Sequence, residues 1–304
     1  MNLSGVISQL ISLFLMMLFG YAIGRFGVID ENFRKKLSSF TLNTACPCVI
    51  ISSVLQSDSV SSDLLGAIGT AIGFFLVMIV LASIVVRVVR TPMEERGLDQ
   101  LMLIFTNIGF MGIPVVQSLY GADGVAQLSM FILIFNLFFF SYGVMLIQHG
   151  VKFNWRSLLN SCIIAALLAL FFGLTNLRLP APIESTLASI GSMNTPLAMM
   201  IIGSSMAFSD VRAALLNKRL YRVGLLSMLV MPLLILAIVY FLPLPPMLAG
   251  LCVILAAMPI AGNCGMLCDI YLPGEMTGAQ AVIVTTLMSG VTLPVISTLV
   301  TALL

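Results

Sequence analysis

Charged side chains are what this sequence most lacks. Only 9% of its 304 residues are charged, against about 25% in a typical globular chain. It has one histidine and one tryptophan, and 60% of its residues are hydrophobic. This composition excludes a secreted domain, a soluble enzyme and a disordered tail. The formal net charge of +2, without any basic stripe, also argues against a nucleic-acid-binding protein.

Cysteine and histidine are too few and too scattered to indicate a metal centre. All six cysteines lie in apolar stretches, so no disulfide framework is predicted. Cys264 and Cys268 share a helix face, but the only histidine, His149, lies in a loop, and we interpret the pair as small hydrophobic side chains. The sequence has no His-Glu-x-x-His motif and no nucleophile–base pair. We therefore expect no metal, no cofactor and no catalytic residues.

Long apolar stretches fill almost the whole chain. A helix that spans a bilayer needs about 20 residues, and ten stretches reach that length or come close to it. They predict an all-α polytopic membrane protein with no room for a separate soluble domain. The predicted spans are residues 6–24, 33–55, 64–89, 98–120, 124–148, 157–174, 183–208, 220–242, 247–271 and 276–304.

The basic residues predict how the chain is oriented. Of the 14 Lys and Arg residues, all but Arg178 fall in loops on one side of the predicted membrane. Loops rich in Lys and Arg face the cytoplasm. We therefore expect both termini to lie outside a plasma membrane.

The two halves of the sequence resemble each other at an offset of about 151 residues. An Asn-Thr pair at 43–44 recurs at 194–195, each followed closely by a proline, and Tyr120 recurs as Tyr271. We interpret the chain as a duplication with repeats at 1–150 and 151–304. Five spans is an odd number, so the second repeat must enter the membrane from the opposite side. Inverted repeats of this kind are typical of secondary transporters, whose sites lie near the midplane where the repeats meet.

Helix-breaking residues occupy the middle of the fourth and the ninth spans. We expect both helices to be broken there, because proline removes a backbone donor and glycine weakens a helix interior. The alternative is that these residues are kinks and close-packing points, which are common in membrane helices. The predicted substrate-binding residues in the two spans are Asn107, Gly109, Gly112, Pro114, Pro259, Gly262 and Asn263.

Two broken helices predict an anion site. Each half-helix begins with unpaired N–H groups and a partial positive charge, so an anion can be bound without a buried Lys or Arg. Exposed backbone at membrane depth is tolerated only inside protein or along a water-filled cavity. Asn107 and Asn263 add amide donors and acceptors at these positions.

Three further polar residues lie within predicted spans. Asn43 and Asn194 either face the same cavity from the other side or join helices by hydrogen bonds. Asp269 is the one carboxylate that we place inside a span, and an intramembrane acid suggests proton coupling. Its position near the interface allows solvation instead. The remaining acidic residues lie in loops or at span ends, where we expect them to be solvated.

The stretches Thr-Asn-Ile-Gly-Phe-Met-Gly-Ile-Pro at 106–114 and Ala-Met-Pro…Asn at 257–263, within ten spans, resemble the auxin efflux carrier family. The family includes the plant PIN-type carriers and short bacterial members, and its fold is similar to that of the bile acid/sodium symporters. The resemblance implies that spans 4 and 9 cross at Pro114 and Pro259. It places Asn107 and Asn263 in the polar site.

The resemblance also implies a mechanism. Spans 3–5 and 8–10 would form a moving transport domain, as in an elevator mechanism, against a dimeric scaffold of spans 1, 2, 6 and 7. The implied substrates are organic anions: auxin in plants, and dicarboxylates such as malate or malonate in bacteria. The loop between spans 5 and 6 is short, unlike that of many PIN-type carriers, and favours a bacterial inner membrane. No cluster of midplane acids indicates a sodium site.

We thus expect a secondary transporter of small organic anions, which works as a homodimer by alternating access in the lipid bilayer. The alternative is a transporter-like sensor or receptor that binds an organic anion without moving it. A passive channel is disfavoured because nothing resembles a selectivity filter.

Overall fold

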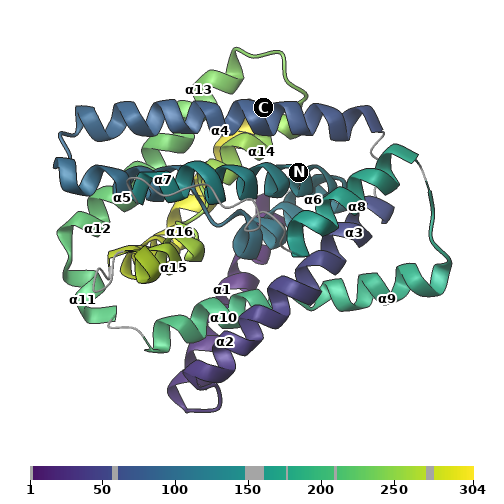
Figure 1. Ribbon diagram of the computed structural model, residues 1–304, viewed down its shortest axis with the longest axis horizontal. Coiled ribbons are helices and arrows are strands. Elements are labelled where there is room, and N and C mark those ends of the chain that lie inside the picture. Colours follow the sequence, from purple (N-terminus) through teal and green to yellow (C-terminus); the bar gives the residue numbers. More distant parts are fainter. Residues whose placement is uncertain (1–2, 57–60, 148–160, 176, 209–210, 272–276) are drawn as a thin grey trace. The chain divides into compact units, whose positions relative to one another are not determined.

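The computed structural model describes residues 3–56, 61–147, 161–175, 177–208, 211–271 and 277–304. Over these residues the chain is helical, and its only β-structure is one isolated bridge (Figure 1). Five helical stretches are long and apolar enough to cross a membrane: Glu31–Gln56, Leu64–Val88, Ile108–Ile147, Lys218–Tyr240 and Gln280–Leu303. Shorter apolar helices lie at Ile11–Arg25, Ser161–Thr175 and Pro246–Ala256. The protein is therefore a multi-pass membrane protein.

Helix lies in each of the ten predicted ranges, but several ranges hold more than one helix. The first half contains α1 (Leu3–Arg25), α2 (Glu31–Phe40), the π-helix η1 (Thr41–Ala45), α3 (Cys46–Gln56), α4 (Ser61–Val88), α5 (Met93–Ile104), η2 (Ile108–Gly112), α6 (Ile113–Phe138), η3 (Phe139–Gly143) and α7 (Val144–Ile147). The second half contains α8 (Ser161–Thr175), α9 (Ala181–Ser192), α10 (Asn194–Phe208), α11 (Val211–Leu216), α12 (Lys218–Leu225), η5 (Leu226–Val230), α13 (Met231–Tyr240), α14 (Pro246–Ala256), α15 (Gly262–Tyr271) and α16 (Thr277–Leu303).

The long helix α6 contains the turn that we predicted between the fourth and fifth spans. Gly121 has a φ of 65° and a ψ of −153°, so the two parts of α6 meet at a sharp kink. That φ lies in a region that glycine adopts without steric cost. The opposite orientation of the two halves of the chain stays a prediction.

The chain divides into two compact units. Unit 1 comprises Met1–Ala71, Gly109–Asn136 and Arg156–Ser209, and unit 2 comprises Ile72–Ile108, Leu137–Trp155 and Asp210–Leu304. Both units are built from segments far apart in the sequence, so neither coincides with a sequence repeat. The division places residues 109–136, which belong to the predicted fourth and fifth spans, in the same unit as the first, second, sixth and seventh predicted spans. The separation of the chain into a scaffold and a moving transport domain stays a prediction.

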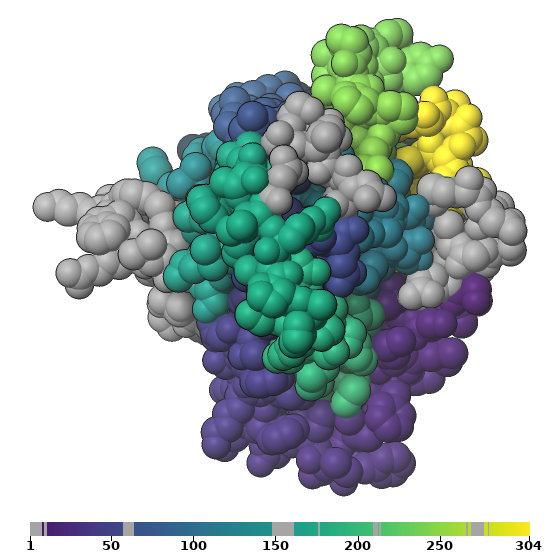
Figure 2. All heavy atoms as spheres, turned by 90° about the vertical axis from the view of Figure 1, so that its right-hand side faces the viewer, coloured from purple at the N-terminus to yellow at the C-terminus, as the bar shows by residue number. Residues whose placement is uncertain are grey.

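Glycine allows two helices of unit 1 to approach closely. A Cβ atom at Gly203 on α10 would overlap the carbonyl oxygen of Met17 on α1, and one at Gly20 would lie 2.5 Å from the backbone of Met200. Such small-residue contacts are typical of membrane helix pairs, where dispersion replaces the hydrophobic effect. On the face drawn in Figure 2, the green helices α9 and α10 lie against the purple N-terminal helices.

Three of the π-helices share a sequence signal. η1, η2 and η5 each end two residues before a proline: Pro47, Pro114 and Pro232. Proline lacks an N–H group and its ring clashes with the carbonyl group of residue i−4. A widened turn at that position relieves the clash while the helix continues. Proline therefore widens these spans without ending them.

Candidate functional site

Both predicted helix breaks occur in unit 2. Helix α5 ends at Ile104 and residues 105–107 leave the helix, with Phe105 extended. Helix α14 ends at Ala256, and residues 257–261 are irregular before α15 begins at Gly262.

The first break lies earlier than we predicted, and three residues have a different role. Gly109 and Gly112 lie in η2, and Pro114 is the second residue of α6, so all three follow the break and do not form it. The physical reason is that Pro114 is accommodated by the π-turn before it. Asn107 lies within the break, as expected.

The two breaks satisfy each other's backbone. Asn107 N donates to Pro259 O at 2.7 Å, and Ala261 N donates to Phe105 O at 3.1 Å. Between these bonds, Thr106 faces Ile260 in an antiparallel bridge. Bilayer hydrocarbon offers no partner for an open N–H or C=O group. Reciprocal pairing therefore explains how two irregular segments persist among apolar helices.

Two threonine hydroxyl groups complete this crossing. Thr106 Oγ1 donates to Leu255 O at 2.7 Å, which satisfies a carbonyl group in the last turn of α14. Ile260 N donates to Thr285 Oγ1 at 3.1 Å, and this hydroxyl group donates in turn to Ala281 O on α16. The sequence interpretation missed both residues, because threonine in a membrane helix usually bonds only its own backbone.

The crossing is buried and uncharged. Residues 101–108 and 253–261 are buried. Asn107 is 6% exposed, and the Phe105 ring packs edge-on against that of Phe139 at 5.1 Å. Asn263, in the first turn of α15, is half-buried. No charged residue occurs in 101–108 or in 253–268, so the local electrostatics come from peptide dipoles and amide groups.

The glycines Gly109 and Gly262 beside the breaks are open, whereas Gly97 in α5 is closely packed. A Cβ atom at Gly262 or at Gly109 would meet no atom within 4 Å. A Cβ atom at Gly97 in α5 would overlap the carbonyl oxygen of Leu146. The alternative that glycine serves close packing thus holds for Gly97 but not for Gly109 or Gly262.

In unit 1, Asn43 joins two helices. It lies in η1, where its Nδ2 donates to Ser39 O at 2.8 Å and its Oδ1 accepts from Ser161 Oγ on α8 at 2.7 Å. These bonds agree with the interpretation that Asn43 joins helices by hydrogen bonds. A role of Asn43 in a substrate site stays a prediction.

Asn194 differs from Asn43, its equivalent in the repeat. It is the first residue of α10 and only 1% exposed. Neither its amide nitrogen nor its amide oxygen has a hydrogen-bond partner among the described residues. Burying an amide without a partner costs roughly 1–3 kcal/mol. Of the two predicted unit 1 asparagines, Asn194 is therefore the stronger candidate for a ligand contact.

Comparison with known proteins decides the class of the protein. The model of the family described as "Membrane transport protein" matches the chain twice, over residues 5–152 and 149–297. The chain belongs to this family of membrane transport proteins, the auxin efflux carrier (PIN-like) family. The two matches meet near residue 150 and support a transporter built from two repeats.

Two archaeal relatives of this transporter agree with the assignment. An uncharacterized transporter from Methanothermobacter thermautotrophicus is 24% identical over 269 residues, which cover 84% of this chain and 86% of that protein. An uncharacterized transporter from Methanocaldococcus jannaschii is 25% identical over 210 residues, which cover 64% and 66% of the two chains.

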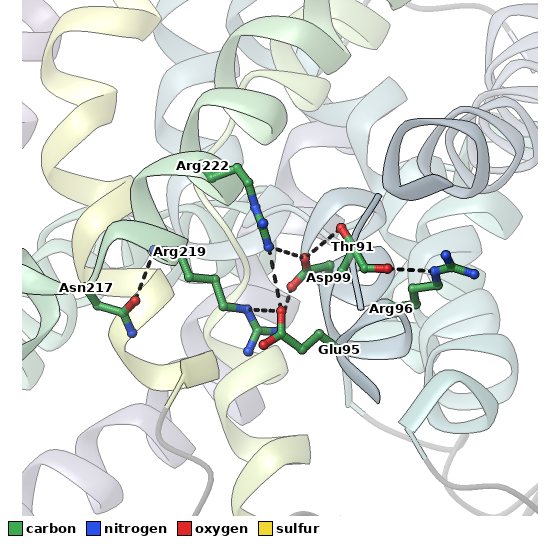
Figure 3. A network of polar contacts seen from close by, with 7 residues as sticks. All are labelled: Thr91, Glu95, Arg96, Asp99, Asn217, Arg219 and Arg222. Carbon is green, nitrogen blue, oxygen red and sulfur yellow. Dashed lines mark hydrogen bonds and ion pairs between the residues drawn. The ribbon is translucent and has the colours of Figure 1, made fainter. Parts of the chain in front are cut away.

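An ion-pair network holds the transporter's helix α5 to α12 within unit 2 (Figure 3). Asp99 Oδ1 lies 2.8 Å from Arg219 Nη2, and Asp99 Oδ2 lies 3.5 Å from Arg222 Nη2. Glu95 Oε2 contacts both arginines, at 3.3 and 3.6 Å. The Asp99 side chain is 3% exposed. The prediction that all acidic residues apart from Asp269 are solvated is therefore wrong for Asp99, since two facing arginines compensate its burial.

Asp269 itself lies in α15, towards the C-terminal end of that helix. Its side chain is outside the described part of the structure, so proton coupling through Asp269 stays a prediction. No group of three or more metal-ligating side chains occurs among the described residues.

Proposed function

We propose that this family member is a secondary transporter of small organic anions, and that the anion binds at the crossing of the two helix breaks. The observation that carries the proposal is the reciprocal bonding of residues 105–107 with 259–261, beside a glycine with open space at the start of α15. Mono- and dicarboxylates are the substrate class that we favour.

Electrostatics support an anion more than a cation. The first N–H groups of α15 carry a partial positive charge, and no acidic residue lies in 101–108 or 253–268 to attract a cation. Asn107 and Asn263 supply amide groups that can donate to a carboxylate. Gly262 leaves room for the ligand to approach the main chain.

We propose alternating access as the mechanism. The predicted domain of spans 3–5 and 8–10 would move against a dimeric scaffold of spans 1, 2, 6 and 7, with both termini outside a plasma membrane. Asn107, Gly109, Gly112, Pro114, Pro259, Gly262, Asn263, Asn43 and Asn194 are the proposed substrate contacts, and Asp269 is the proposed proton-coupling residue.

Binding of anions by the purified protein tests this proposal. A ligand that binds only the folded state raises the apparent melting temperature. We expect a carboxylate from a panel of mono- and dicarboxylates, indole acids and bile acids to raise it, and Asn107→Ala and Asn263→Ala to remove the effect. Asn217→Ala is the matched control, because Asn217 only caps α12 and its loss should lower stability without removing the ligand effect.

Counterflow in proteoliposomes separates transport from sensing. Exchange of the bound carboxylate across the vesicle membrane supports a transporter. Binding without exchange would support the sensor alternative. If no anion shifts the melting temperature and none is exchanged, the anion proposal is wrong.

A further inference from the structure

Two cysteine thiols touch across a helix interface of unit 1. Cys46 is the first residue of α3 and Cys162 is the second residue of α8, and their Sγ atoms lie 3.5 Å apart. Cys162 Sγ also lies 3.5 Å from Leu42 O. The hydrogen bond between Ser161 and Asn43, at 2.7 Å, connects the same two segments next to the thiols. Both thiols are therefore held at a fixed interface.

The remaining cysteines give a useful contrast. Cys264 is buried, and its sulfur lies against backbone carbonyl oxygens, 3.6 Å from that of Phe105. Cys48 is half-buried on the same helix as Cys46, two residues away. Residues two apart on a helix do not share a face, so Cys48 is a natural control for Cys46.

The two thiols differ in access. Cys46 is 4% exposed, whereas Cys162 is half-buried. A small reagent therefore reaches Cys162 before Cys46. The buried Cys46 thiol can then react with the sulfur of the modified Cys162. This order matches the division between attacking and resolving thiols in thiol–disulfide exchange.

We propose that Cys46 and Cys162 form a dithiol modification site that reacts with small disulfides. The Cys162 thiolate attacks one sulfur of the reagent, which forms a mixed disulfide and expels one thiolate. The Cys46 thiolate then attacks the Cys162 sulfur and expels the second thiolate. The protein loses two protons and two electrons and gains one S–S bond, and the reagent is reduced to two thiols. The Sγ atoms need to approach from 3.5 Å to about 2.0 Å.

The bond would connect residues 116 positions apart in the sequence. A cross-link over so long a segment restricts the unfolded chain strongly. Oxidation should therefore raise the apparent melting temperature of the protein, and dithiothreitol should reverse the rise. The thiols lie next to Asn43, which is a proposed substrate contact. The dithiol proposal is tested by thiopyridone release and the peptide map, which do not require anion binding, so either proposal can fail alone.

The test uses the full-length reduced protein in detergent with one equivalent of 4,4′-dithiodipyridine. We expect two thiopyridone molecules released per reagent consumed, and a Cys46–Cys162 disulfide in the peptide map. Cys46→Ser should release one and retain the thiopyridyl group on Cys162. Cys48→Ser should behave like the wild type.

Three outcomes would overturn the proposal. They are a stable thiopyridyl adduct on Cys162 of the wild type, a disulfide that uses Cys48 in place of Cys46, and failure of Cys162 to react at all. Serine for cysteine is a conservative change, and the wild-type peptide map alone decides the pairing if a variant does not fold.

Discussion

In unit 1 the helix around Asn43 widens into a π-turn and continues, whereas in unit 2 the chain leaves the helix at residues 105–107 and at 257–261. A π-turn keeps most backbone groups paired within one helix. A full break leaves several backbone N–H and C=O groups without partners in their own helix. In unit 2 the two breaks supply hydrogen-bond partners for each other. The difference teaches that a proline such as Pro47 can be accommodated within one continuous helix, whereas the two full breaks of unit 2 pair their backbone groups with each other.

Two helix pairs, one in each unit, are also held together differently. In unit 1, α1 and α10 approach through glycine, and the contact is apolar. In unit 2, α5 and α12 are joined by Asp99, Glu95 and two arginines. A close glycine contact is destabilised when a larger side chain is introduced, and a buried ion pair is destabilised when one partner is removed. Different substitutions therefore test the two contacts: a larger residue at the glycine contact and removal of a charge at the ion pair.

The largest expected effect is that of Asp99→Ala. It leaves Arg219 and Arg222 with only the partly exposed carboxylate of Glu95, and loss of one partner of a buried pair costs about 3–5 kcal/mol. We expect a large drop in the melting temperature of the detergent-solubilised protein.

Glu31→Ala in unit 1 is the matched control. Glu31 forms an exposed ion pair with Lys35 at 2.9 Å, and such surface pairs contribute little. We expect no measurable change in the melting temperature. Equal effects of the two substitutions would contradict the contrast between a buried and a solvated carboxylate.

A smaller effect is expected for Gly203→Ala in unit 1. The added methyl group overlaps the Met17 carbonyl oxygen on α1, and overpacking of this kind costs about 1–3 kcal/mol. Gly262→Ala is the control, because its methyl group enters open space and alanine favours the helix by up to about 1 kcal/mol.

Gly262→Ala should therefore melt no lower than the wild type but bind carboxylates more weakly. Thermal unfolding with and without ligand measures both effects. Unchanged carboxylate binding in Gly262→Ala would show that the open space at the start of α15 is not used by the ligand.

The smallest effect is expected for the hydrogen bond between Asn43 and Ser161. A double-mutant cycle with Asn43→Ala and Ser161→Ala should give a coupling energy of about 0.6 kcal/mol, the average for such bonds between membrane helices. Anion exchange measured on the same variants distinguishes the two interpretations of Asn43. Coupling with intact exchange supports an interhelical role, and lost exchange without coupling supports a substrate contact.

Much of the fold was predictable from the sequence because lipid imposes simple constraints. Every predicted span contains helix, although α11 (Val211–Leu216) lies between two of them. Proline with glycine in the fourth and ninth spans predicted that both would break. The position of the first break was wrong by several residues, because Pro114 produced a π-turn. Pro47 and Pro232 likewise follow π-turns within continuing helices, so a proline in a span does not by itself locate a break.

The candidate site was predictable only in part. Asn107 and Pro259 were identified because polar and helix-breaking residues fall in the middle of both the fourth and the ninth spans, at positions that the repeat matches. Thr106 and Thr285 were missed, since threonine is common there and its partners are 149 and 25 residues away in the sequence. Asp99 was missed because its position at the end of a span suggested solvation.

The sequence by itself determined the membrane class and the ranges that contain helix, because composition records what lipid requires of each segment separately. The duplication and the family followed from recurring residues and from the resemblance of two short stretches. Only the tertiary structure decided which backbone groups of the two breaks pair, which glycines are packed and which are open, and that Asp99 faces two arginines. Those features depend on atoms brought together from distant segments, and a hydrogen bond or an ion pair exists only once both partners are in place.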